Sequence, residues 1–127
     1  MTETRPLASR RYRADDIGAV QELYHSKGWT DGLPIVPPTE PAVRACLDWV
    51  MMDPDQLIGI EPVRELAITA EKLAINAVMA GCRPEQFPVL LAAIDCLAQP
   101  QMNHRDMQVS GHTEAPLILV NGPIAKK

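Results

Sequence analysis

Three side chains of this sequence are candidates for nucleophilic or proton-transfer chemistry: Cys82, His112 and Glu71. Cys82 comes just before Pro84, a residue typical of the first turn of a helix, and Arg83 stands between them. Backbone N–H groups at a helix N-terminus and a neighbouring positive charge both stabilise a thiolate. We therefore expect Cys82 to be a nucleophile or a charge-stabilising thiolate, with simple packing of a free cysteine as the alternative.

His112 and Glu71 are the expected partners of this cysteine in catalysis. His112 stands in a polar segment shortly before an apolar run, where it could transfer protons; an ordinary surface histidine is the alternative. Glu71 falls in the first turn of an expected helix, where a carboxylate also complements the helix dipole. It precedes Cys82 by eleven residues, roughly 16 Å along a helix axis, so the two side chains cannot touch directly.

Five further polar or aromatic residues are candidates for binding a substrate. Lys72 and Asn76 share one face of an otherwise apolar helix, so they either find partners or line a cavity. Trp29 and Asp31 stand in a proline-flanked loop that could wall a pocket, unless they are a core tryptophan and a turn aspartate. Asn121 follows an apolar run, and ligands gather at the carboxyl ends of strands in α/β sheets, although Asn-Gly is also a common turn.

We expect neither a metal nor an organic cofactor. No pair of cysteines has CxxC spacing, which excludes a zinc ribbon or a thioredoxin-type site. Asp106 and Glu114 stand near two histidines, but their spacing matches no metal motif. The sequence also contains no Gly-rich phosphate loop and no dinucleotide fingerprint. A metal-dependent lyase or hydrolase remains an alternative.

The composition limits the class of protein and its partners. The 127 residues correspond to one domain, and 46% hydrophobic residues are enough for a core. A net charge of −4 and only 4% aromatic residues argue against nucleic-acid binding. No apolar run is long enough for a membrane span, and the N-terminus lacks a secretory signal. Three widely spaced cysteines favour the cytoplasm.

The elements that would position these residues follow from capping and periodicity. We expect a flexible N-terminal arm over residues 1–14 and a single domain over residues 15–127. Helical spacing, cap residues and prolines predict four helices, and short apolar runs predict three strands. The helices cover about 16–27, 39–52, 69–80 and 84–98, and the strands cover 56–63, 107–111 and 115–123. The fold class is α/β, a small layered domain with helices packed on a short, mostly buried sheet.

The last predicted strand also points to a partner. The continuous apolar run in residues 115–123 is typical of a strand buried on both faces, yet only four residues follow it. We expect either that a partner chain completes or covers this sheet, or that the strand simply ends the domain.

Three blocks of the sequence resemble the bacterial UGSC-like protein family. They are GWTDGLPIVPPTE, AEKLAINAVMAGCRPEQFPVLLAAI and HTEAPLILVNGPI, which together cover well over half of the chain in the family's order. Longer members continue past the third block, whereas this chain stops at Lys127. The family name refers to a selenocysteine or cysteine motif, but neither UGSC nor CGSC is present here. The resemblance implies one half of a split enzyme, in which a second polypeptide could supply such a residue.

The resemblance also implies that the candidate residues surround one shared pocket. Together, these observations predict a small subunit of a heteromeric cytoplasmic enzyme, a cofactor-independent hydrolase of a small organic substrate. One specific possibility is O-demethylation of an activated aryl ether such as a nitroaromatic compound. The alternatives are a non-catalytic structural subunit that stabilises a catalytic partner, and a metal-dependent lyase or hydrolase.

Overall fold

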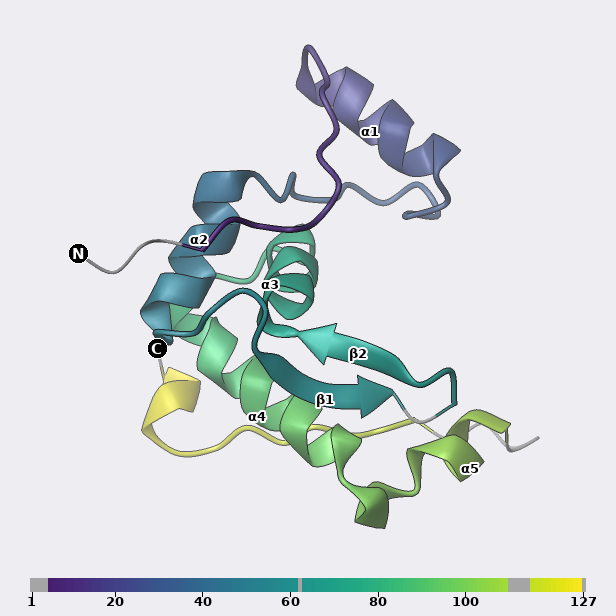
Figure 1. Ribbon diagram of the computed structural model, residues 1–127, viewed down its shortest axis with the longest axis vertical. Coiled ribbons are helices and arrows are strands. Elements are labelled where there is room, and N and C mark those ends of the chain that lie inside the picture. Colours follow the sequence, from purple (N-terminus) through teal and green to yellow (C-terminus); the bar gives the residue numbers. More distant parts are fainter. Residues whose placement is uncertain (1–4, 62, 110–114, 127) are drawn as a thin grey trace.

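The computed structural model describes residues 5–61, 63–109 and 115–126 of the chain. Within these residues, five α-helices and a two-stranded antiparallel sheet form a small α/β domain, which confirms the predicted fold class (Figure 1). The helices are α1 (Ile17–Ser26), α2 (Glu40–Trp49), α3 (Ala70–Met79), α4 (Phe87–Ala98) and α5 (His104–Val109). The strands are β1 (Leu57–Glu61) and β2 (Leu66–Thr69). Three short 3-10 turns are η1 (Pro84–Gln86), η2 (Pro100–Met102) and η3 (Pro123–Lys126).

The first and third helices begin and end where their cap residues predict. The Asp16 carboxylate accepts a 2.8 Å hydrogen bond from the Ala19 N–H at the start of α1. The Thr69 hydroxyl accepts a hydrogen bond from the backbone N–H of Lys72 at the start of α3. Gly81 follows α3 with a φ of +81°, a backbone conformation that glycine adopts without steric cost. The sequence therefore fixes both ends of α3 locally.

The core lies mainly between α2 and α3. Val43, Cys46 and Leu47 of α2 are buried against α3, and Phe87 at the start of α4 closes one end of this cluster. The α3 face consists mostly of alanines, so the two helix backbones can approach closely. These alanines and their larger neighbours on α3 are Ala70, Leu73, Ala74, Ala77 and Val78.

The sheet is small and rests on α4. β1 and β2 pair antiparallel, with Gly59 opposite Ile68 and an irregularity in β1 next to that glycine. A Cβ atom at Gly59 would lie 2.7 Å from the Cβ of Ala98, so the absence of a side chain lets β1 approach α4. The sheet is less buried than predicted, because three of its apolar side chains, those of Leu57, Ile60 and Leu66, are more than half exposed.

Two predicted strands are wrong. Residues 107–109 belong to α5, and the remainder of that prediction lies outside the described residues. Residues 115–121 belong to no helix or strand, and their side chains are exposed rather than buried. An apolar run forms a buried strand only where neighbouring strands accept its hydrogen bonds, and none of the described residues does so here. In Figure 1 this segment passes along the α4 side of the molecule.

Residues 5–13, which the sequence predicts to form a loose arm, contact the body of the domain. The Arg5 guanidinium donates two 2.8 Å hydrogen bonds to the carboxylate of Asp55. Arg11 forms a 3.0 Å ion pair with Glu40 at the start of α2. Within the described part of the chain, no helix is long and apolar enough to cross a membrane.

Candidate functional site

Glu71 joins α3 to the N-terminal arm. Glu71 is only 4% exposed. Each of its two carboxylate oxygens accepts a hydrogen bond from one backbone N–H of the arm. The Ala8 N–H donates to Oε2 at 3.0 Å, and the Ser9 N–H donates to Oε1 at 2.8 Å. A buried charge is tolerated only where such hydrogen bonds satisfy it. Glu71 therefore fastens two segments that are more than sixty residues apart in the sequence.

The surroundings of Glu71 keep it ionised. Burial alone raises the pKa of this carboxyl group, but the hydrogen bonds from the Ser9 side chain and from the Ala8 and Ser9 backbone lower it. The nearby Lys72 charge acts in the same direction, and the pKa falls below its ordinary value. A general base for proton transfer near neutral pH needs the opposite shift. Glu71 therefore holds the arm in place as an ionised hydrogen-bond acceptor and does not have the properties of a general base.

Lys72 and Asn76 find partners within the chain, as one reading of their spacing predicts. The Lys72 Nζ donates a 3.0 Å hydrogen bond to the Ser9 hydroxyl, next to the Glu71 contact. The Asn76 Nδ2 donates to the Lys72 carbonyl at 2.8 Å, one turn earlier on the same helix. Both side chains remain exposed. Neither is buried in an enclosed pocket.

A hollow of about 450 Å³ lies between the arm and the start of α3. Its walls carry Glu71 and Lys72 together with charged and small residues of the arm and of the turn before β1. These other residues are Arg5, Pro6, Ala8, Ser9, Pro54, Asp55 and Thr69. The first N–H groups of α3 already donate to Gln56, Pro54 and Thr69, so none is free to bind an anion there.

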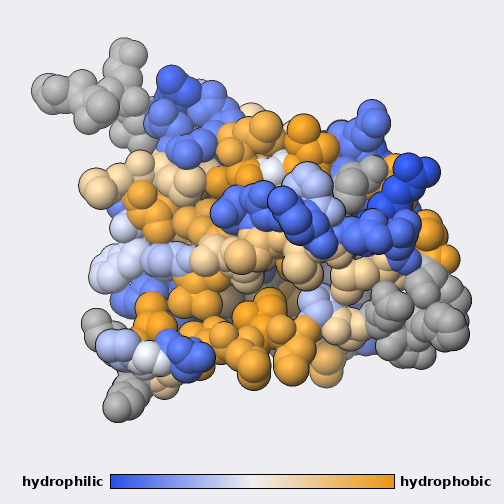
Figure 2. Space-filling model, turned by 90° about the horizontal axis from the view of Figure 1, so that it is seen from below, coloured by the Kyte–Doolittle hydropathy of each residue, from blue (hydrophilic) through white to orange (hydrophobic). Residues whose placement is uncertain are grey.

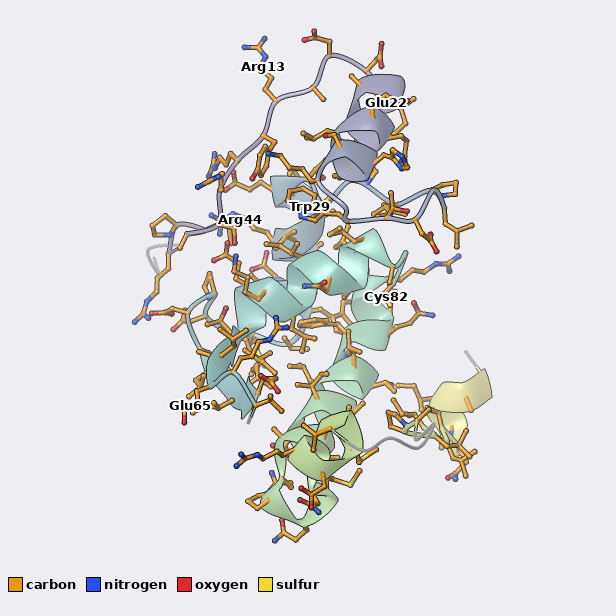
Figure 3. All side chains as sticks on the ribbon, turned by 90° about the vertical axis from the view of Figure 1, so that its right-hand side faces the viewer. Arg13, Glu22, Trp29, Arg44, Glu65 and Cys82 are labelled. Atoms are coloured by element: carbon orange, nitrogen blue, oxygen red, sulfur yellow. The ribbon has the colours of Figure 1, made fainter. Side chains whose placement is uncertain are left out.

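Cys82 lies in the joint between α3 and η1, as predicted. It is half-buried against the core, and its N–H donates to the Ala77 carbonyl at 2.9 Å. The Arg83 N–H donates to the Gln86 side chain at 2.8 Å, so that side chain caps the following turn. Figure 3 shows Cys82 at this helix junction. Cys82 is thus partly exposed at the place that the sequence indicates.

Trp29 belongs to an aromatic cluster that packs α1 against the arm. Its ring lies 5.3 Å from the Tyr12 ring in an edge-on arrangement and 5.8 Å from the Tyr24 ring. Asp31 is exposed in the turn that follows. In Figure 3, Trp29 lies nearer to α1 than Cys82 does. Further along the same loop, however, Val36 lies beside Gly81, so the loop does reach the helix joint that holds Cys82.

The two remaining candidates stand on the C-terminal side. Asn121 is exposed at the end of residues 115–121, which form no strand that it could follow. His112 lies outside the described residues. The structure thus brings Glu71 and Lys72 together, but it places Cys82, Trp29 and Asn121 in three other regions.

The sequence did not identify the arm residues of this arrangement. Ala8 and Ser9 act through backbone N–H groups, which leave no signature in a side-chain pattern. The contact of Arg5 had only a weak signal in the sequence, namely the presence of a basic N-terminal arm and of an acidic pair, Asp53 and Asp55, in the same chain. No spacing rule connects residues so distant in the sequence.

Comparison with known proteins adds no assignment. No family model matches the chain, and neither a curated protein nor a solved structure matches it. Among the described residues, no group of three or more histidine, cysteine, aspartate and glutamate side chains is arranged to hold a metal ion. The fold and the site therefore define a small α/β domain with a half-buried cysteine, Cys82, and an N-terminal arm held by hydrogen bonds to Glu71.

Proposed function

We propose that this chain is the small subunit of a heteromeric enzyme, in which a second protein chain covers its exposed apolar surface. The observation that carries the proposal is the exposure of four consecutive large apolar residues, 117–120. Figure 2 shows hydrophobic residues gathered on the face of the molecule that carries α4 and the C-terminal segment. Contiguous exposed apolar surface of this kind is typical of protein–protein interfaces.

Within that assembly, the proposed activity is cofactor-independent hydrolysis of a small organic substrate. The partial exposure of Cys82 supports this proposal, and the resemblance to the UGSC-like family adds the expectation of a split enzyme. For an activated aryl methyl ether, the thiolate would attack the ring carbon, and the methoxy group would leave as methanol after taking up a proton. Water would then release the phenol and regenerate the thiol. The partner would supply the other catalytic groups, together with any contribution of His112.

A second candidate is a non-catalytic subunit that stabilises a catalytic partner. It is favoured by the intrachain contacts of Glu71, Lys72 and Trp29, because side chains that hold the fold together are poorly placed to bind a substrate. All three cysteines are free, which supports the proposed cytoplasmic location for either candidate.

The reactivity of Cys82 in the assembled protein separates the two candidates. The tagged chain is purified with its partner from its own cells, and the complex is assayed for hydrolysis of para-nitroanisole. Cys82→Ser is compared with Cys96→Ser, which changes an exposed cysteine on α4. We expect Cys82→Ser to lose more than about 100-fold in rate, and Cys96→Ser to retain its activity.

The other outcomes are equally informative. Hydrolysis that survives Cys82→Ser would assign the chemistry to the partner and leave this chain a structural role. A chain that purifies alone, remains monomeric and has no activity would refute the subunit proposal itself.

A further inference from the structure

Residues 117–120 alternate in exposure as the residues of a β-strand do, although they belong to no sheet. The exposed fractions of Leu117, Ile118, Leu119 and Val120 are 83%, 54%, 78% and 46%. They alternate, so Leu117 and Leu119 face outward and the two residues between and after them are partly covered. A period of two is that of a β-strand, in which successive side chains point to opposite faces.

The main chain of this segment has no hydrogen-bond partner in the part of the chain that the structure describes. Among the described residues, none donates to or accepts from the backbone of residues 115–121. Pro116 and Pro123 bracket the segment, and a proline has no N–H for a strand ladder. The stretch available for pairing is therefore residues 117–122, in which the Gly122 carbonyl already accepts a hydrogen bond from the Ala125 N–H. The remaining N–H and C=O groups, which are unpaired among the described residues, form the template that an added strand recognises.

These observations define what must cover the segment. The occupant has to supply backbone donors and acceptors along one edge, and it has to bring an apolar layer over Leu117 and Leu119. Residues 115–125 carry no charge, so the complementary surface is uncharged as well. A β-strand at the open edge of a sheet, with apolar side chains above it, meets these requirements.

Pairing between the same segments of two copies of this chain does not meet these requirements. If two copies meet edge to edge about a two-fold axis, their backbones pair but the outward leucines of both stay in water. If they meet face to face, the leucines are buried but the backbones remain unpaired. Each symmetric arrangement therefore satisfies only one of the two requirements.

The sheet of a second copy is also a poor acceptor. α4 packs against β1, whereas Leu57, Ile60 and Leu66 are more than half exposed. The described residues thus leave part of the sheet without an apolar cover. A third strand that joins this sheet would therefore lack the layer needed to bury its own outward leucines.

We propose that residues 117–122 add as a strand to the open sheet edge of a different protein chain, which also covers Leu117 and Leu119. This inference rests on the proposed function, since the acceptor is the partner subunit. It specifies how that partner binds, namely through main-chain hydrogen bonds along the segment and an apolar layer above it.

The test combines amide hydrogen exchange with a proline substitution. The complex purified from the source cells is compared with the isolated chain, and exchange is followed in peptides that cover residues 117–122. We expect the amides of this segment to exchange at least about tenfold more slowly in the complex. Leu119→Pro removes one donor from the middle of the strand, and Ala115→Pro, outside the pairing stretch, is the matched control. We expect Leu119→Pro to reduce recovery of the partner at least about tenfold and Ala115→Pro to leave it unchanged.

Each alternative result overturns the inference in a recognisable way. A partner that binds while residues 117–122 exchange at the free rate, or that binds Leu119→Pro normally, refutes the strand addition but leaves the subunit role intact. If the complex contains only copies of this chain, the acceptor is not a different protein and the inference is refuted. If the chain stays monomeric under all conditions, the strand addition and the proposed function both fail.

Discussion

Replacement of Glu71 by glutamine tests whether the N-terminal arm is part of the folded structure. The carboxylate accepts two backbone hydrogen bonds, at 3.0 and 2.8 Å. Glutamine keeps one acceptor oxygen and turns the other position into a donor that faces an N–H group. A net hydrogen bond to a charged group contributes about 1.5–3 kcal/mol, so the loss of one such bond with a mismatch at its position costs about 2–3 kcal/mol. An arm that detaches regains conformational entropy and water contacts, which lowers the net loss to about 1–2 kcal/mol.

The pH dependence of this contribution has a definite sign. The pKa of Glu71 in the folded protein lies below the ordinary value of 4.5. The unfolded chain therefore binds a proton at a higher pH than the folded chain does. The stabilisation is complete above the unfolded pKa and is lost as the pH falls through the folded value. Glu71→Gln should consequently differ from the wild type at neutral pH and converge with it in acid.

Urea unfolding and limited trypsin digestion measure the two consequences. The exposed Glu22→Gln on α1 removes the same charge without this contact, and it should unfold like the wild type. Trypsin should cut Glu71→Gln faster after Arg10, Arg11 and Arg13, because the arm is released. If Glu71→Gln unfolds at the same urea concentration as Glu22→Gln, and its arm is cut no faster, the carboxylate does not hold the arm and this reasoning is refuted.

Three further predictions concern the packing and the thiols. Gly59→Ala should destabilise the fold by about 1–3 kcal/mol in urea unfolding, because the new Cβ would lie 2.7 Å from that of Ala98. Ala98→Gly in the same chain should restore part of this loss. If the losses of the two single variants simply add in the double variant, the proposed clash is contradicted. Phe87→Ala should cost about 3–5 kcal/mol in the same assay, since this fully buried ring closes the core, and a smaller loss would mean that the helices collapse around the gap. A maleimide reagent at neutral pH should modify the exposed Cys96 quickly and Cys46 only on unfolding, because Cys46 is buried and burial raises the pKa of its thiol; equal rates by mass spectrometry would contradict the packing of α2.

The sequence predicts the central helices well because their determinants are local. Thr69 caps α3 through its own hydroxyl, and Gly81 takes the left-handed conformation just after that helix. Cys82 follows directly, so its place in the helix joint was also predictable. The start of α4 shifts from Pro84 to Phe87 because a tight 3-10 turn comes first, capped by the Gln86 side chain. Interactions that span a few residues are readable in this way.

The candidate site was less predictable because it depends on contacts between distant segments. Ala8 and Ser9 hold Glu71 through their backbone N–H groups. Any residue other than proline carries such a group, so no particular side chain at these positions would reveal the contact. Similarly, Trp29 could be assigned to a pocket or to a core from its loop alone. The rings of Tyr12 and Tyr24 decide the matter, and both lie outside that loop.

The failed strand prediction and the proposed strand addition have the same physical origin. The run from Leu117 to Val120 indicates a strand because four large apolar residues favour burial on both faces. The pattern records what the segment requires but does not say which chain provides it. Here the described residues leave its backbone unpaired and its outward leucines in water. A requirement encoded in a sequence and unmet within its own fold is a reason to look for the surface that meets it, and the backbone pairing and apolar cover needed here limit that surface to a sheet edge.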